Sequence, residues 1–179
     1  MKKLIALLLA LLMLGSVAFA ETTEDVANYE EQDVLDFTIT MDAIPEGYTM
    51  TLVEYEFGPV AIFTSDASGV QYEVNVVYSE LFDGYTMDLE ALTEDEEAEM
   101  REMLSAGYSM PSFTFDKTSH GTDVIIIDEQ DADSDYGEIF SIYEGYMITM
   151  VVMKNDTLTD EDYALGLQIL SDMWFVAKE

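Results

Sequence analysis

Alternating hydrophobic and polar residues predict β-strands along most of this chain. In the stretch 36–41, DFTITM, the apolar residues Phe37, Ile39 and Met41 alternate with two threonines. Successive side chains of a strand point to opposite faces, so this period of two predicts a strand with one buried face. Similar alternation, or a short apolar run, predicts further strands at 51–57, 60–64, 70–79, 112–117, 123–127, 139–143 and 146–153.

Glycine and proline mark the turns between these segments. Proline cannot donate to a sheet ladder, so Gly58-Pro59 is expected to interrupt or turn the chain between 51–57 and 60–64. Only Glu144 and Gly145 separate the last two predicted strands, which is the length of a tight hairpin with glycine at a positive φ. That pair should be antiparallel. Residues 146–153 are apolar on both faces and should form a central strand.

Two segments carry the start signals of helices. Thr93 precedes an acid-rich turn, and Glu96 follows it by three residues, which predicts a capping box for a helix that ends near Gly107. Thr159 likewise precedes three acidic residues, 160–162. Apolar residues then recur at helical spacing: Tyr163, Leu167, Leu170 and Trp174. This stripe is expected to pack on the sheet.

Together these elements predict an α+β fold, an antiparallel β-sheet flanked by helices. One domain is expected over residues 34–179, because a chain of this length can bury a sufficient core. The sequence contains no cysteine, so that core must hold the fold without disulfides. Residues 21–33 are acidic with little apolar content and predict a flexible lead-in.

The first twenty residues are typical of a bacterial secretory signal peptide. Two lysines precede an apolar run, and Ala18-Phe19-Ala20 fits a small-residue cleavage site. The apolar run is too short to span a bilayer, and no later stretch is long enough. The sequence therefore predicts a signal peptide at 1–20 and a secreted, extracellular protein without a membrane span.

The charge of the chain is strongly negative and narrows the choice of partners. It has 38 Asp and Glu residues against 6 Lys and Arg, a formal net charge of −32. Such a field repels phosphate backbones and anionic lipid surfaces, which disfavours nucleic acids and membrane surfaces as partners. An unidentified protein or a cationic partner fits the charge. The alternative is that the charge only keeps a monomeric secreted domain soluble.

The order of elements resembles the PsbP-like (Mog/PsbP-type) superfamily. The resemblance rests on Ile44-Pro45-Glu46-Gly47-Tyr48 after the first strand and on the ending ILSDMWF at 169–175. It implies an α/β/α sandwich and, because members of that superfamily are mostly non-catalytic, a binding or scaffolding role. No partner-contacting residue of the superfamily can be matched to this chain.

Residues for nucleophilic catalysis are sparse. Cysteine is absent, and the single histidine, His120, has Ser119 as its chain neighbour, which neither a strand nor a helix would bring to face it. We therefore expect His120 in a surface turn. Paired carboxylates could support a hydrolase, but the abundance of Asp and Glu makes any chosen pair uninformative. Met147, Met150 and Met153 alternate faces of one strand, which predicts core packing rather than a copper site.

The stretch 128–138, DEQDADSDYGE, is the candidate calcium site. Asp131, Asp133 and Asp135 alternate as in a calcium loop, and with Glu138 they are the four candidate ligands, with weak extracellular affinity. An EF-hand would need glycine at the sixth position, helices on both sides and a glutamate at the twelfth. Here the sixth position is a tyrosine and the flanks predict strands. A solvated connection between antiparallel strands is the favoured interpretation.

The sequence thus predicts a secreted, non-enzymatic binding or structural module with no cofactor and an unknown partner. The first alternative is a weakly calcium-dependent extracellular module that uses the loop 131–138. A carboxylate-based hydrolase is the distant second alternative.

Overall fold

The computed structural model describes residues 37–55, 58–105, 111–129 and 136–177. The strands of this part of the chain are β1 (Phe37–Met41), β2 (Thr49–Tyr55), β3 (Gly58–Thr64), β4 (Val70–Tyr78), β5 (Pro111–Lys117), β6 (Asp123–Glu129), β7 (Tyr136–Tyr143), β8 (Tyr146–Lys154) and β9 (Met173–Ala177). The helices are the 3-10 turn η1 (Glu80–Phe82), α2 (Glu94–Ser105) and α3 (Asp160–Asp172).

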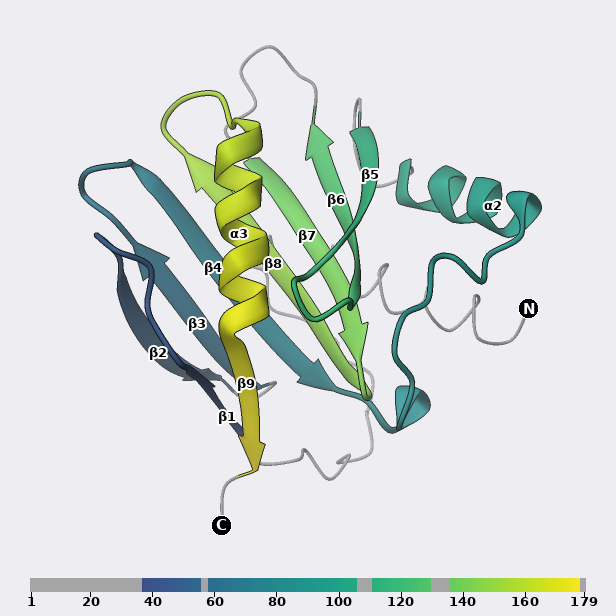
Figure 1. Ribbon diagram of the computed structural model, residues 1–179, viewed down its shortest axis with the longest axis horizontal. Coiled ribbons are helices and arrows are strands. Elements are labelled where there is room, and N and C mark those ends of the chain that lie inside the picture. Colours follow the sequence, from purple (N-terminus) through teal and green to yellow (C-terminus); the bar gives the residue numbers. More distant parts are fainter. Residues whose placement is uncertain (1–36, 56–57, 106–110, 130–135, 178–179) are drawn as a thin grey trace, which may run out of the picture.

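Seven strands form one antiparallel sheet in the order β2-β3-β4-β8-β7-β6-β5 (Figure 1). Strand β8 lies at its centre, paired with β4 on one side and β7 on the other, which confirms the prediction for 146–153. The chain does turn between 51–57 and 60–64, but the prediction that it turns at Gly58-Pro59 is wrong: both residues begin β3, where Gly58 pairs with Tyr55 and Pro59 with Glu54. Strands β1 and β9 pair with each other as a separate two-stranded ribbon.

The hairpin between β7 and β8 is as tight as predicted. Tyr143 pairs with Tyr146, and Glu144 and Gly145 connect them with φ angles of 48° and 91°. Two consecutive residues at positive φ match the right-handed twist of the flanking strands. Gly145 adopts a positive φ without steric penalty, whereas Glu144 adopts it at an energetic cost because it has a Cβ.

The sheet is covered on both faces. On one face, α3 and the β1-β9 ribbon bury side chains such as Phe37, Ile169 and Met173 against β4 and β8 (Figure 1). On the other face, a second core joins α2 and the segment before it to β6 and β7; its buried members are Phe82, Met87, Met100, Leu104, Ile125, Ile127, Phe140 and Ile142. Met147 packs against this second core and Met150 lies in the first, so their core role is confirmed.

Both predicted helix starts are confirmed. The backbone N–H of Thr93 donates to the Glu96 carboxylate over 3.0 Å, and the Glu96 N–H donates to the Thr93 hydroxyl over 3.3 Å. Thr159 and Asp162 form the same reciprocal pair before α3. Each box satisfies backbone donors that a helix start leaves without partners.

The predicted α+β class, with its PsbP-like α/β/α sandwich, is wrong. Strands hold 50% of the described residues and helices 21%, so the fold is predominantly β. A sandwich needs helical layers on both faces, but here a two-stranded ribbon shares one face with α3. The physical reason lies in 173–177, MWFVA, whose aromatic and β-branched residues favour extended backbone.

This strand also corrects the predicted helical stripe. Helix α3 ends at Asp172, so Trp174 lies on β9, where it pairs with Thr40. The residues that α3 buries are Tyr163, Gly166, Ile169 and Ser171. The antiparallel sheet itself, and packing of α3 on it through Tyr163, are as expected.

The predicted signal peptide at 1–20 and the acidic lead-in at 21–33 lie outside the described residues. Within the described part of the chain, no helix has the length and hydropathy needed to cross a bilayer.

Candidate functional site

The candidate calcium residues fall mostly outside the described ranges. Asp131, Asp133 and Asp135 are not described, whereas Glu138 lies on β7, and its carboxylate accepts a hydrogen bond from the Tyr136 hydroxyl. The stretch joins β6 to β7, which are antiparallel neighbours, so its interpretation as a strand connection is confirmed. Among the residues that are described, no three His, Asp or Glu side chains lie close enough to hold a metal ion.

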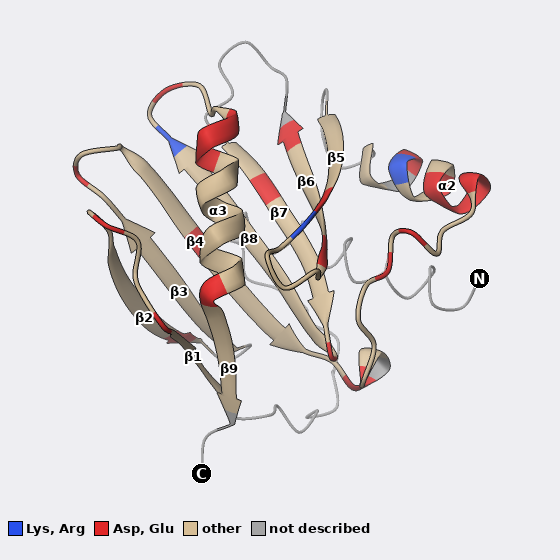
Figure 2. Ribbon diagram, viewed as in Figure 1, with Lys and Arg blue, Asp and Glu red and all other residues tan. Residues whose placement is uncertain are grey.

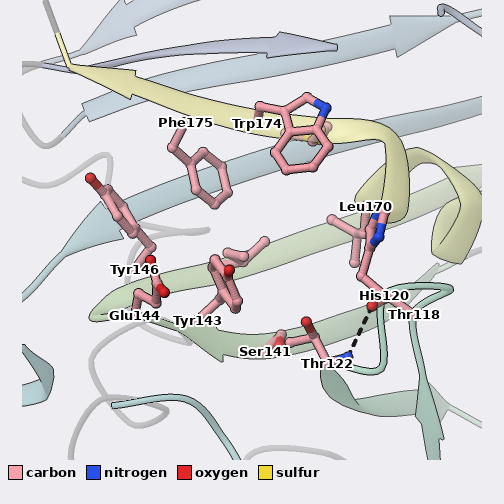
Figure 3. A pocket seen from close by; sticks show the side chains of 12 residues that line it. Thr118, His120, Thr122, Ser141, Tyr143, Glu144, Tyr146, Leu170, Trp174 and Phe175 are labelled. Atoms are coloured by element: carbon pink, nitrogen blue, oxygen red, sulfur yellow. Dashed lines mark hydrogen bonds between the residues drawn. The ribbon is translucent and has the colours of Figure 1, made fainter. Parts of the chain in front are cut away.

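A pocket of about 360 Å³ opens where α3 passes into β9, on the sheet face that α3 covers (Figure 3). Three segments distant in sequence build it. Strand β9 supplies one wall, the loop 118–122 supplies another, and the β7-β8 hairpin forms the floor and rim. Nothing in the local pattern of any one segment predicts it.

Aromatic side chains line the wall at β9. Because alternate residues of a strand face opposite sides, Met173 turns into the core, whereas Trp174 is 47% exposed. The ring of Phe175 stacks on that of Tyr146, with centroids 4.9 Å apart. Tyr143 from β7 is also exposed at this pocket. The wall therefore presents large aromatic surfaces to solvent.

The loop 118–122 is tied to the end of α3. The His120 Nε2 lies 2.6 Å from the carbonyl oxygen of Ser171, and the Ser119 N–H donates to the Ser171 hydroxyl over 3.0 Å. A carbonyl oxygen can only accept, so Nε2 must carry the proton. His120 thus satisfies one of the carbonyls that the last turn of a helix leaves free. Its predicted place in a surface turn is confirmed.

The ring of His120 also packs on the pocket wall. Its centroid lies 5.5 Å from that of Trp174. The backbone of the loop closes on itself, since the Thr118 N–H donates to the Thr122 carbonyl and the Gly121 N–H to the Thr118 carbonyl, each over 2.9 Å. Gly121 has φ +81°, which favours glycine. These contacts fix His120 and the loop beside β9.

An ion pair anchors the strands beneath this loop. The Lys117 ammonium binds the carboxylate of Asp123, which is 4% exposed, and lies 3.3 Å from Glu90. The hydrogen bond that the Lys117 ammonium donates to Asp123 stabilises its charged form and raises the pKa of Lys117. The Ser141 hydroxyl, at the pocket floor, donates to the Asp123 carbonyl over 2.7 Å. The floor is therefore held by hydrogen bonds within the fold.

The charge at this pocket is negative. Glu144 is the one carboxylate among its described lining residues, and that lining includes no lysine or arginine. Figure 2 shows Asp and Glu on both helices and at many strand ends, with Lys and Arg at few positions. With a formal net charge of −32 for the whole chain, the surrounding field has the same sign.

A second pocket of about 370 Å³ lies at the opposite end of β8. Gly69, Gln71, Tyr136, Met153, Lys154 and Asn155 line it. Its one charged lining residue, Lys154, is bound by Asp162 over 2.9 Å. This pocket lacks the grouped aromatic rings of the first and is the weaker candidate.

Two residues of the first pocket are unusual in the sequence, although neither predicts a pocket by itself. Glutamate is an unusual residue at a hairpin position that requires positive φ, where Asn, Asp or Gly is preferred. Trp174 is the single tryptophan, and its spacing placed it on a buried helical stripe. The approach of His120 to Ser171 spans 51 residues and has no local signature.

Comparisons with known proteins identify no relative. No family model matches the sequence, no curated protein matches it, and no solved structure matches its fold. The resemblance to the PsbP-like superfamily therefore stays an untested prediction.

Proposed function

We propose that the protein is a secreted, non-enzymatic binding module whose ligand site is the pocket between β9, the loop 118–122 and the β7-β8 hairpin. We name it the β9 pocket. The observation that carries the proposal is Trp174, a large apolar side chain that is 47% exposed at a concave surface. Ligand sites are concave, rich in aromatic surface and furnished with a few polar groups, with volumes of roughly 300 to 1,000 Å³.

The rigidity of the β9 pocket supports a binding role. His120 and Ser119 join the loop to Ser171, and Tyr146 and Phe175 stack across two elements. A site whose walls are already ordered loses little conformational entropy when a ligand enters. The hydrogen bonds that build the walls thus favour affinity for a ligand.

The polar groups of the β9 pocket support binding rather than catalysis. The Ser141 hydroxyl donates to a backbone carbonyl, and the His120 Nε2–H donates to another, so neither activates the other. A carboxylate hydrolase would need two converging carboxyl groups, and Glu144 is the one carboxyl among the described lining residues. These contacts support the non-enzymatic proposal.

Fluorescence of Trp174 tests the proposed site, because it is the single tryptophan of the chain. The secreted protein is titrated with a panel of small neutral sugars, aliphatic alcohols, carboxylates and amines. We expect at least one class to shift the emission at millimolar concentration and to perturb the indole N–H resonance.

Two variants locate the binding. Thr122→Tyr places a ring at the pocket and is expected to abolish the shift, whereas Thr64→Tyr, at an exposed position on β3, should leave it unchanged. If no compound of any class perturbs Trp174, or if Thr122→Tyr binds as the wild type does, the β9 pocket is not the ligand site.

A further inference from the structure

We infer that the ligand of the β9 pocket is an organic cation, an amine or quaternary ammonium group with a small apolar body. This inference rests on the proposed function, because it names the class of ligand for the same site. Three observations carry it: the charge of the lining, the aromatic surfaces, and the backbone conformation of Glu144.

The charge of the lining excludes anions and favours cations. An anionic ligand would meet the carboxylate of Glu144 and no lysine or arginine among the described lining residues. It would also enter a molecule with a net charge of −32. The same field raises the local concentration of cations, because charge of one sign around a concave surface attracts the opposite sign.

The aromatic surfaces fit a cation better than a neutral apolar group. The face of an aromatic ring carries negative electrostatic potential, and tryptophan attracts a cation most strongly of the aromatic side chains. Trp174 and Tyr143 are 47% and 40% exposed at this pocket. A quaternary ammonium ion suits such a wall, since it has no N–H groups to satisfy and its methyl groups pack on the rings.

The backbone of Glu144 favours a role beyond the hairpin. With φ at 48°, it holds a conformation that destabilises residues with a side chain, and asparagine or glycine would fit this turn better. Its backbone N–H donates to the Thr86 hydroxyl over 3.2 Å, and its carboxylate forms no ion pair with a described residue. Strain of this kind gathers at functional sites.

Choline and 3,3-dimethylbutan-1-ol test the inference, because they have the same shape and differ in the charge of the central atom. Trp174 fluorescence is titrated with each compound at equal ionic strength. We expect choline to bind about tenfold more tightly than the neutral alcohol, since cation–π and carboxylate attraction together have that magnitude.

Two variants test whether the preference for choline over the neutral alcohol arises at the β9 pocket. Glu144→Gln should weaken choline about threefold and leave the alcohol unchanged. Glu102→Gln, at an exposed position on α2, removes the same charge far from the pocket and should change neither affinity. Equal binding of choline and the alcohol overturns the cation inference and leaves the proposed binding site standing. If neither compound changes the Trp174 fluorescence, the cation inference is wrong. Titration with the wider panel of compounds then tests the proposed binding site itself.

Discussion

The hydroxyl of Tyr163 donates a hydrogen bond to the Asp128 carboxylate over 2.8 Å and so joins α3 to β6. Gly137 on β7 makes room for this contact, because a Cβ there would overlap the Tyr163 hydroxyl. Asp128 is the first residue of the acidic stretch, and its pairing with Gly137 begins the β6-β7 ladder. Three elements thus meet at one hydroxyl.

Replacing Tyr163 with phenylalanine should lower the free energy of unfolding by about 1.5 kcal/mol, the scale of a hydrogen bond to a charged group. Tyr163 is 8% exposed, so its ring packing would be kept and the effect assigned to the hydroxyl. Urea denaturation measures the change. Tyr143→Phe, at an exposed position, is the control and should alter stability by less than about 0.5 kcal/mol. If the two variants lowered the free energy of unfolding equally, the hydrogen bond from Tyr163 to Asp128 would not contribute to stability as proposed.

Gly166 is expected to be required for the close approach of α3 to the sheet. A Cβ at this position would lie 2.9 Å from Ile139 Cδ1 and 3.0 Å from Met150 Sδ, and both side chains are fully buried. Alanine would favour the helix by about 1 kcal/mol, but overpacking destabilises by about 1 to 3 kcal/mol. We expect Gly166→Ala to lower the free energy of unfolding by about 1 kcal/mol in urea denaturation.

Ile139→Val provides the matched background, because it removes the Cδ1 atom that the new Cβ would meet. In that background, Gly166→Ala should be neutral or stabilising. Additive effects of the two substitutions would show that the limiting contact lies elsewhere.

The free energy of unfolding should fall at acid pH, in part because Asp162 becomes protonated. Its Oδ2 accepts hydrogen bonds from Lys154 Nζ over 2.9 Å and from the Thr159 N–H over 2.8 Å. Burial alone raises the pKa of Asp162, but these hydrogen bonds outweigh it and hold the pKa below its ordinary value. A lowered carboxyl pKa stabilises the fold above the unfolded value of about 3.9, and this stabilisation is lost as the pH falls through the folded pKa.

Asp162→Asn tests this linkage by urea denaturation between pH 7 and pH 3. The variant should be less stable by about 1.5 kcal/mol at pH 7, and the difference should shrink below about pH 4. Asp160→Asn, at an exposed position in the same helical turn, should show a smaller difference. A difference for Asp162→Asn that stays constant down to pH 3 would contradict the lowered pKa.

Local patterns predicted the strands and helix starts because their causes are local. The period of two in 36–41 depends on neighbouring side chains, and the reciprocal hydrogen bonds of Thr93 and Glu96 span three residues. The hairpin at Glu144-Gly145 follows from loop length. Each of these predictions needed a few adjacent residues.

The fold class and the β9 pocket could not be predicted in the same way. Trp174 lies eleven residues after Tyr163, a spacing that fits a helical stripe. The residues of 173–177 also favour extended backbone, and the pairing of β9 with β1 stabilises that alternative. The pocket likewise depends on contacts such as His120 with Ser171, which the tertiary fold creates. Periodicity carries no information about such distant contacts.

Calcium is expected to leave the melting midpoint unchanged beyond any effect of magnesium at the same concentration. The flanks of the acidic stretch already have partners, since Tyr163 donates to Asp128 and Tyr136 donates to Glu138. If Asp131, Asp133, Asp135 and Glu138 bound calcium with a dissociation constant of about 1 mM, 10 mM calcium would stabilise the fold by about 1.4 kcal/mol. The midpoint would then rise by about 3 to 6 °C.

Magnesium is the control because both ions screen the acidic surface, but magnesium demands a smaller octahedral site. A rise specific to calcium, lost in an Asp131→Asn, Asp133→Asn double variant, would support the calcium-dependent alternative.

Glu144→Asn should separate stability from ligand binding. Asparagine tolerates positive φ at this hairpin position, so the free energy of unfolding should rise by about 1 kcal/mol. The same change removes the carboxylate from the β9 pocket, so choline affinity should fall about threefold. Glu144→Gln keeps the strained backbone and loses the charge, and should therefore weaken choline without a gain in stability. Urea denaturation and Trp174 fluorescence measure the two effects in the same samples. An asparagine variant that binds choline as tightly as the wild type would show that this glutamate does not contribute to cation binding.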